Sequence, residues 1–132
     1  MGFEELPHTA DCALRIWAPD LEALFVEAAL GLNELAGARL GGAAPTVREI
    51  SLRSSDAESL LVAFLTDLIF FQEHENLGFS HFRLRLSGDT LSGSIEGSRL
   101  AFLTRPIKAV TFHNLRIRRT GRGQEVDIVF DV

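Results

Sequence analysis

The apolar residues of this chain follow two different periods, and the order of these periods constrains the fold more than any other feature. Residues 11–17 alternate between apolar and polar side chains, which predicts a half-buried strand. Residues 21–36 and 55–71 carry apolar side chains at helical spacing. A strand-like segment at 46–53 separates the two helical segments, and residues 82–131 are strand-like throughout.

This order of elements predicts an α+β domain, with a mainly antiparallel sheet and two helices packed on one face. The length of 132 residues suits one domain, residues 1–132, and the Gly- and Ala-rich stretch 37–45 connects two of its elements. Asp20 is placed to cap the first helix and Gly37 to end it. Ser55 and Glu58 have the spacing of a capping box at the start of the second helix.

The last strands have a clear inward and outward side. Gly88-Asp89 predicts the turn of a hairpin between 82–86 and 91–95. In the final strand Val126, Ile128 and Phe130 alternate with Asp127, Val129 and Asp131. By the same parity Asp11 and Asp131 both lie opposite the apolar side of their strands, so we expect both to avoid the helix-covered core.

Composition excludes several classes of protein. A formal net charge of −5 argues against broad binding to a phosphate backbone. Cys12 is the only cysteine, so an internal disulfide and a cysteine-based zinc site are excluded. The longest apolar run, within residues 60–71, is too short and too polar to span a bilayer. We expect a cytoplasmic protein, because the N-terminus lacks the charged flank and apolar core of a secretory signal.

Carboxylates near both ends of the chain are the clearest candidate for a functional site. Asp11 opens the first predicted strand, and Asp131 immediately precedes the terminal carboxylate of Val132. If the fold brings the two ends together, these groups form an oxygen-rich site for a hard divalent cation. The alternative is that both aspartates are ordinary solvated carboxylates at strand ends.

Other polar residues have two interpretations each. His8 and His113 are either hydrogen-bonded structural histidines or support for the metal site and its partner, since neither has the neighbours of a zinc ligand. Asp67 either is exposed on the polar side of its helix or faces the same surface as Asp11. Lys108 belongs to a basic stretch that is either a solvated face or a surface for RNA phosphate or an acidic partner.

The chain resembles the archease family over essentially its whole length. The resemblance rests on His8-Thr9-Ala10-Asp11, on Lys108-Ala109-Val110-Thr111-Phe112-His113, on the ending Phe130-Asp131-Val132, and on the long apolar second helix. It implies a non-catalytic protein that binds a divalent cation, usually calcium, through residues matching Asp11, Asp131 and Val132. It also implies a role as activator of the GTP-dependent RNA ligase of tRNA splicing, by promoting guanylylation of the ligase and its multiple turnover.

Two other functions fit the residues without that resemblance. A chaperone or interaction module would act through the apolar second helix and Trp17, independently of metal. A small hydrolase would use the acidic pair with a metal-activated water. The sequence contains no Walker loop, no Rossmann glycine fingerprint and no nucleophile elbow, so we expect no nucleotide cofactor. That the chain is not itself an enzyme is what the resemblance implies. The resemblance implies a protein partner, the RNA ligase, with at most weak RNA contact, and we expect no membrane association.

Overall fold

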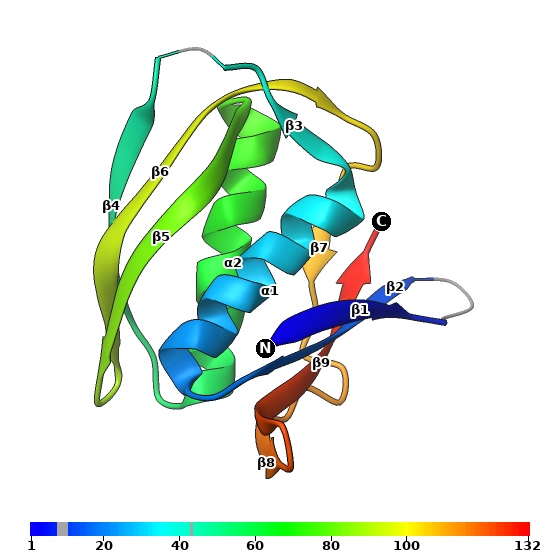
Figure 1. Cartoon of the computed structure of the whole chain (residues 1–132), viewed down its shortest axis with the longest axis vertical. Coiled ribbons are helices and arrows are strands. Elements are labelled where there is room, and N and C mark those ends of the chain that lie inside the picture. Colours follow the sequence, from blue (N-terminus) through cyan, green and yellow to red (C-terminus); the bar gives the residue numbers. More distant parts are fainter. Residues whose placement is uncertain (8–10, 43) are drawn as a thin grey trace.

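The computed structural model describes residues 1–7, 11–42 and 44–132. Two helices, α1 (Leu21–Ala36) and α2 (Ala57–His74), lie together between two antiparallel sheets (Figure 1). The strands are β1 (Gly2–Leu6), β2 (Cys12–Ala18), β3 (Ala38–Leu40), β4 (Thr46–Arg53), β5 (Leu77–Ser87), β6 (Thr90–Leu103), β7 (Ala109–Val110), β8 (Arg118–Thr120) and β9 (Gly123–Asp131).

The first sheet brings the two ends of the chain together. Its strand order is β1-β2-β9-β7, and β8 pairs with the other end of β9. The β2–β9 ladder is antiparallel and runs from Cys12 opposite Phe130 to Ala18 opposite Gln124. The first strand predicted from the sequence, β2, and the last strand, β9, are therefore direct neighbours.

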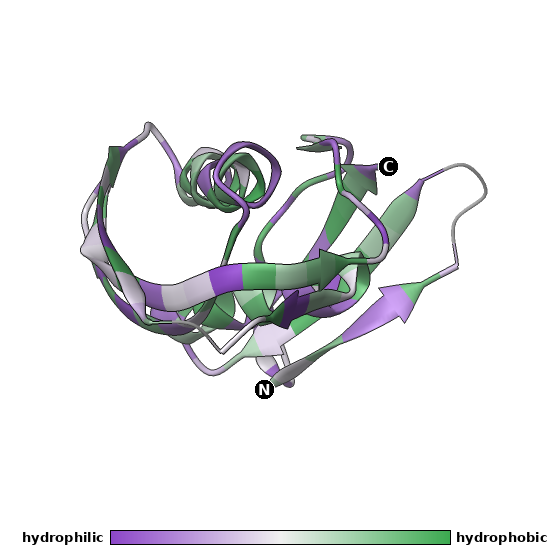
Figure 2. Cartoon of the chain, turned by 90° about the horizontal axis from the view of Figure 1, so that it is seen from above, coloured by the Kyte–Doolittle hydropathy of each residue, from purple (hydrophilic) through white to green (hydrophobic). Residues whose placement is uncertain are grey.

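The second sheet is built around β6, which pairs antiparallel with β3, β4 and β5. Seen from above, this sheet curves around one side of the helix pair (Figure 2). Two glycines of β6 allow β5 to approach closely. A Cβ at Gly93, whose φ is 150°, would collide with the carbonyl oxygen of Arg83, and one at Gly97 would collide with that of Gly78. Close backbone approach explains glycine at both positions.

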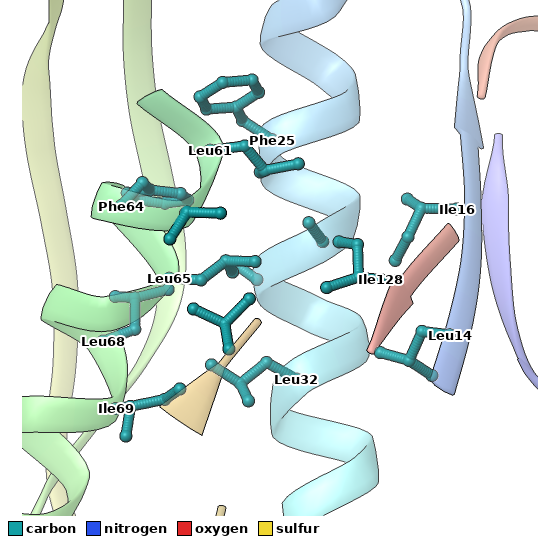
Figure 3. Packing of buried hydrophobic residues seen from close by; sticks show 14 of the residues in the cluster. Leu14, Ile16, Phe25, Leu32, Leu61, Phe64, Leu65, Leu68, Ile69 and Ile128 are labelled. Atoms are coloured by element: carbon teal, nitrogen blue, oxygen red, sulfur yellow. The ribbon is translucent and has the colours of Figure 1, made fainter. Parts of the chain in front are cut away.

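The core fills the space between the two sheets and the two helices (Figure 3). The first sheet contributes Leu14, Ile16 and Ile128, which are almost completely buried. Helix α2 contributes Phe64, which stacks on Phe25 of α1 with ring centroids 6.0 Å apart. Burial of side chains this large is the main stabilising contribution to such a domain.

Local signals explain where the helices begin and end. The carboxylate of Asp20 accepts a hydrogen bond from the backbone N–H of Ala23 at 2.8 Å, and Gly37 ends α1 with a φ of 62°. Both ends of α1 are therefore as predicted. The predicted capping box of α2 is wrong, because Asp56 is the N-cap and accepts from the N–H of Ser59 at 2.7 Å. The carboxylate of Glu58 instead accepts from the N–H of Ile117.

The α+β class, the antiparallel pairing and the β5–β6 hairpin are confirmed. The strands divide between two sheets, whereas the pattern predicted one. The strand β3 was expected to be loop, and β1 was not predicted, because its five residues include two consecutive glutamates and show no alternation. In the described part of the chain, neither helix has the length and hydropathy needed to cross a membrane.

Candidate functional site

The register of β2 and β9 brings Asp11 and Asp131 to the same end of the first sheet. Cys12 and Phe130 are the last residue pair of the β2–β9 ladder. Asp11 directly precedes Cys12, and Asp131 directly follows Phe130. Figure 1 shows the C-terminus at the end of the sheet where β2 starts. Asp11 is half-buried, while Asp131 and Val132 are exposed. The residues of the candidate site therefore lie at the same end of the first sheet.

On the other side of β9, the short strand β7 holds the last residues in place. Ala109 pairs with Asp131 and Val110 with Phe130. The backbone N–H of Lys108 donates to the carbonyl oxygen of Asp131 at 2.8 Å. The backbone of Asp131 is thus fixed in the sheet, so its exposed side chain starts from a defined position.

His113 lies on a loop beside the outward face of this sheet. Its neighbour Asn114 has a φ of 51°, a conformation that Asn adopts more readily than most residues, and the two side chains approach to 3.3 Å. A depression of about 200 Å³ lies under this loop. It is lined by Leu6, Pro7, Ala13, His113, Asn114, Arg118, Asp127 and Val129. Ala13 and Val129 are paired one position inside the Cys12–Phe130 pair, so His113 lies on the same face as the candidate site.

Further along this face an ion-pair network crosses from β2 to β9. Arg15 makes two parallel hydrogen bonds to the carboxylate of Asp127, at 2.8 and 3.0 Å. This bidentate pairing lowers the pKa of Asp127 and raises that of Arg15. The network links the two strands that carry the candidate ligands.

Glu125 is the buried centre of the same network. Its carboxylate accepts hydrogen bonds from Arg118 and Thr120, each at 3.0 Å, and from Arg122 at 3.2 Å. Burial alone would raise the pKa of Glu125, but the hydrogen bonds and the positive charges outweigh it, so the pKa is lowered. The guanidinium of Arg122 also lies 3.9 Å from the ring centroid of Trp17.

Ion pairs divide the predicted basic stretch into two groups. The stretch consists of Arg105, Lys108, Arg116, Arg118, Arg119 and Arg122. Arg118 and Arg122 both form ion pairs with Glu125, and Arg105 pairs with Glu5 at 3.4 Å. Lys108, Arg116 and Arg119 are exposed. Sequence reasoning missed this network, although opposite charges on the outward positions of two strands were visible, because their pairing depends on the register.

Asp67 lies on a different side of α2 from the residues that approach Lys108. It is half-buried on α2, and burial raises its pKa. The side of α2 that approaches Lys108 carries Ile69 and Glu73, which line a cavity of about 230 Å³ together with Lys108. Seen down the helix axis, Ile69 and Glu73 lie about 160° and 120° from Asp67. His8 lies outside the described residues.

Within residues 1–7, 11–42 and 44–132, no three side chains of His, Cys, Asp or Glu are close enough to hold a metal ion. The predicted ligand set contains only two such side chains, Asp11 and Asp131, and its third member is the main-chain carboxylate of Val132. Oxygens of this kind suit Ca²⁺ better than Zn²⁺ or another nitrogen- and sulfur-seeking ion.

Comparison with known proteins gives one consistent family. The sequence profile of the archease protein family matches residues 3–132. Protein archease of Methanopyrus kandleri is 32% identical over 142 residues, covering 100% of both chains. Protein archease of Methanosarcina barkeri is 31% identical over 140 residues, covering 98% of this chain and 95% of the relative.

Solved structures agree with the fold. The crystal structure of an archease from Thermotoga maritima, described as a possible chaperone, has a TM-score of 0.71 and 24% identity, covering 98% of this chain and 96% of its own. The solution structure of a Methanobacterium thermoautotrophicum protein has a TM-score of 0.74 and 27% identity, covering 99% of both chains. With a profile match over nearly all residues and two relatives above 30% identity, the chain belongs to the archease protein family.

Proposed function

We propose that this protein is a metal-binding accessory protein that activates a GTP-dependent RNA ligase by promoting its guanylylation and multiple turnover. Membership of the archease family supports an accessory or chaperone-like role. The ligase as partner rests on the resemblance of the three short motifs described above. The chain supplies no nucleotide site of its own in this proposal, so GTP is bound by the ligase.

The observation that carries the proposal is the antiparallel register of β2 and β9. It brings Asp11 and Asp131 to one end of the sheet, next to the terminal carboxylate. Clustered carboxylates repel one another, and a divalent cation relieves that repulsion while filling its coordination shell with oxygens. Three protein groups leave coordination positions open for water or for an oxygen of the partner, and Ca²⁺ tolerates such irregular geometry.

An exposed cation bound at a chain end can act on a partner in a simple way. If the ligase conformation that accepts guanylate binds the metal-loaded end more tightly than other conformations do, binding shifts the ligase toward that conformation. Lys108 and His113 flank the end of the sheet and are exposed, so they are available for contact with the ligase. The effect requires differential affinity for two ligase states and no chemistry by the accessory protein.

The proposal is tested by ligase guanylylation with Asp11→Ala and Asp131→Ala proteins. Asp89→Ala is the matched control, because Asp89 is an exposed carboxylate in the β5–β6 turn, far from the chain ends. We expect the control to stimulate guanylylation like the unmodified protein and both end variants to lose stimulation. Full stimulation by both folded end variants would remove the site from the mechanism.

The burial of α2 does not favour the chaperone that would act through this helix. Most of its apolar side chains are in the core, and Phe70, at 50% exposure, is the large apolar residue that α2 presents to solvent in the described structure. A chaperone acting through this surface would suppress aggregation of an unfolded client equally with and without chelator. Such protection, together with no effect on the ligase, would favour that function.

A further inference from the structure

The outward face of the second sheet forms a separate surface, turned away from the helices. The inward positions of its strands, such as Ile50, Ile95 and Phe82, pack in or against the core. The outward positions are aligned by the register of the three strands. Glu49 of β4, Ser94 of β6 and Arg83 of β5 form one row across the sheet, and Ser51, Ser92 and Arg85 form the next.

This face is hollowed along its central strand, because β6 carries small side chains there. Two depressions of about 280 and 400 Å³ share Arg83 and Ser94, so they adjoin. We call this hollow the sheet trough and define it by six residues: Arg83, Arg85, Ser92, Ser94, Glu49 and Glu96. Its floor is the serine hydroxyls, and one wall is the pair of arginines.

The arginine wall is not neutralised. Arg83 and Arg85 are exposed and project from the same side of β5, about 7 Å apart along the strand. Neither makes a side-chain hydrogen bond or an ion pair within the described part of the protein. Glu49 is two strand spacings away, about 10 Å. Two adjacent cations without a partner, in a chain of net charge −5, form a site for an anionic ligand.

The rest of the trough restricts the kind of anion. Glu96 on β6 and Glu49 on β4 line the same depressions as the arginines and would repel a continuous phosphate backbone. Among the described residues that line the two depressions, His81 carries the one aromatic ring, so successive bases of single-stranded RNA would find little stacking surface. An extended peptide is favoured, because alternate side chains of a strand repeat at the same spacing of about 7 Å as Arg83 and Arg85.

We propose that the sheet trough docks an extended segment of a partner protein that carries carboxylates at two alternate positions. Each carboxylate accepts the forked hydrogen bonds of one guanidinium, from Arg83 or from Arg85. The hydroxyls of Ser92 and Ser94 lie beneath the segment and are available to its polar groups. The trough is on a different sheet from the chain ends, so this inference does not depend on the proposed ligase function.

The test is fluorescence anisotropy with a labelled Thr-Glu-Thr-Glu-Thr peptide at low ionic strength. We expect saturable binding that weakens about tenfold or more in the Arg83→Gln/Arg85→Gln protein, because hydrogen bonds between charged groups are lost. The matched control is Arg116→Gln/Arg119→Gln, which removes two exposed arginines outside the trough and should leave the affinity unchanged. A peptide with adjacent rather than alternate glutamates should bind more weakly, and a glutamine peptide should not bind.

Each other outcome overturns the inference. Absence of saturable binding, or equal weakening in both double variants, would show that the trough is not a specific peptide site. Binding of a labelled oligouridylate, but not of the peptide, through Arg83 and Arg85 would assign the trough to RNA instead. A homodimer seen by sedimentation that disappears in the Arg83→Gln/Arg85→Gln protein would identify a second copy as the occupant. All variants change exposed side chains, and circular dichroism verifies their folding.

Discussion

Replacing Glu125 with alanine tests whether the charge network on the first sheet stabilises the pairing of β2 with β9. The side chain of Glu125 is 8% exposed and accepts hydrogen bonds from two arginines and one threonine. Breaking a buried ion pair costs about 3–5 kcal/mol when the remaining charge stays buried. Here Arg118 and Arg122 are 39% and 43% exposed and can return to water, so we expect a loss of about 2 kcal/mol.

This loss is measurable by thermal unfolding. A chain of 132 residues has an unfolding entropy of about 0.28 kcal/mol/K, so about 2 kcal/mol lowers the Tm by about 7 °C. Glu49→Ala is the matched control, because it removes an exposed glutamate from strand β4. We expect the control to shift the Tm by less than about 2 °C.

The pH dependence of the free energy of unfolding distinguishes an electrostatic contribution of Glu125 from a contribution of its packing. Since the pKa of Glu125 is lowered by folding, its contribution is fully present above the ordinary carboxyl pKa and is lost as pH falls through the folded value. The isosteric variant Glu125→Gln should therefore be less stable than the unmodified protein at pH 7, with a smaller difference at pH 3. A difference that is equal at both pH values, or larger in acid, would refute the electrostatic explanation.

Three further changes give independent outcomes, each read by urea unfolding. Phe64→Ala removes a completely buried ring that stacks on Phe25, and it should cost about 3–5 kcal/mol; a loss below 1 kcal/mol would contradict this packing. Gly93→Ala should cost at least about 2 kcal/mol, because the added Cβ meets the Arg83 carbonyl at a φ of 150°; an unchanged midpoint would be inconsistent with it. Burial raises the pKa of Asp67, so Asp67→Asn should increase stability at pH 7 by a fraction of a kcal/mol, and the gain should disappear below about pH 4; a gain that persists in acid would have another cause.

Much of the secondary structure could be predicted because the signals are local. Asp20 and Gly37 mark the two ends of α1 through backbone geometry that depends on few neighbours. Alternation of apolar residues identified β2 and β9 and placed Ile128 inward. The predicted capping box of α2 failed because Asp56, the residue after Ser55, is the N-cap, and Glu58 accepts instead from the distant N–H of Ile117. A hydrogen bond between residues this far apart in the chain cannot be predicted from the local sequence.

The candidate site shows the same division between local and long-range information. The outward parity of Asp11 and Asp131 follows from each strand alone. Whether the two aspartates lie near each other depends on which strand pairs with β2. Strand order is set by the packing of both sheets around the helices. The Arg15–Asp127 pair could not be predicted for this reason. Its partners are 112 residues apart and meet only through the β2–β9 register.

Calorimetric titration with Ca²⁺ tests most directly whether the two chain ends together bind a cation. We predict saturable binding of one ion per chain at pH 7, loss of that binding in both Asp11→Ala and Asp131→Ala proteins, and its retention in Asp89→Ala. An extra residue after Val132 should also weaken it, because the terminal charge moves away. No heat of binding with the unmodified protein, or undiminished binding by either end variant, would contradict the account.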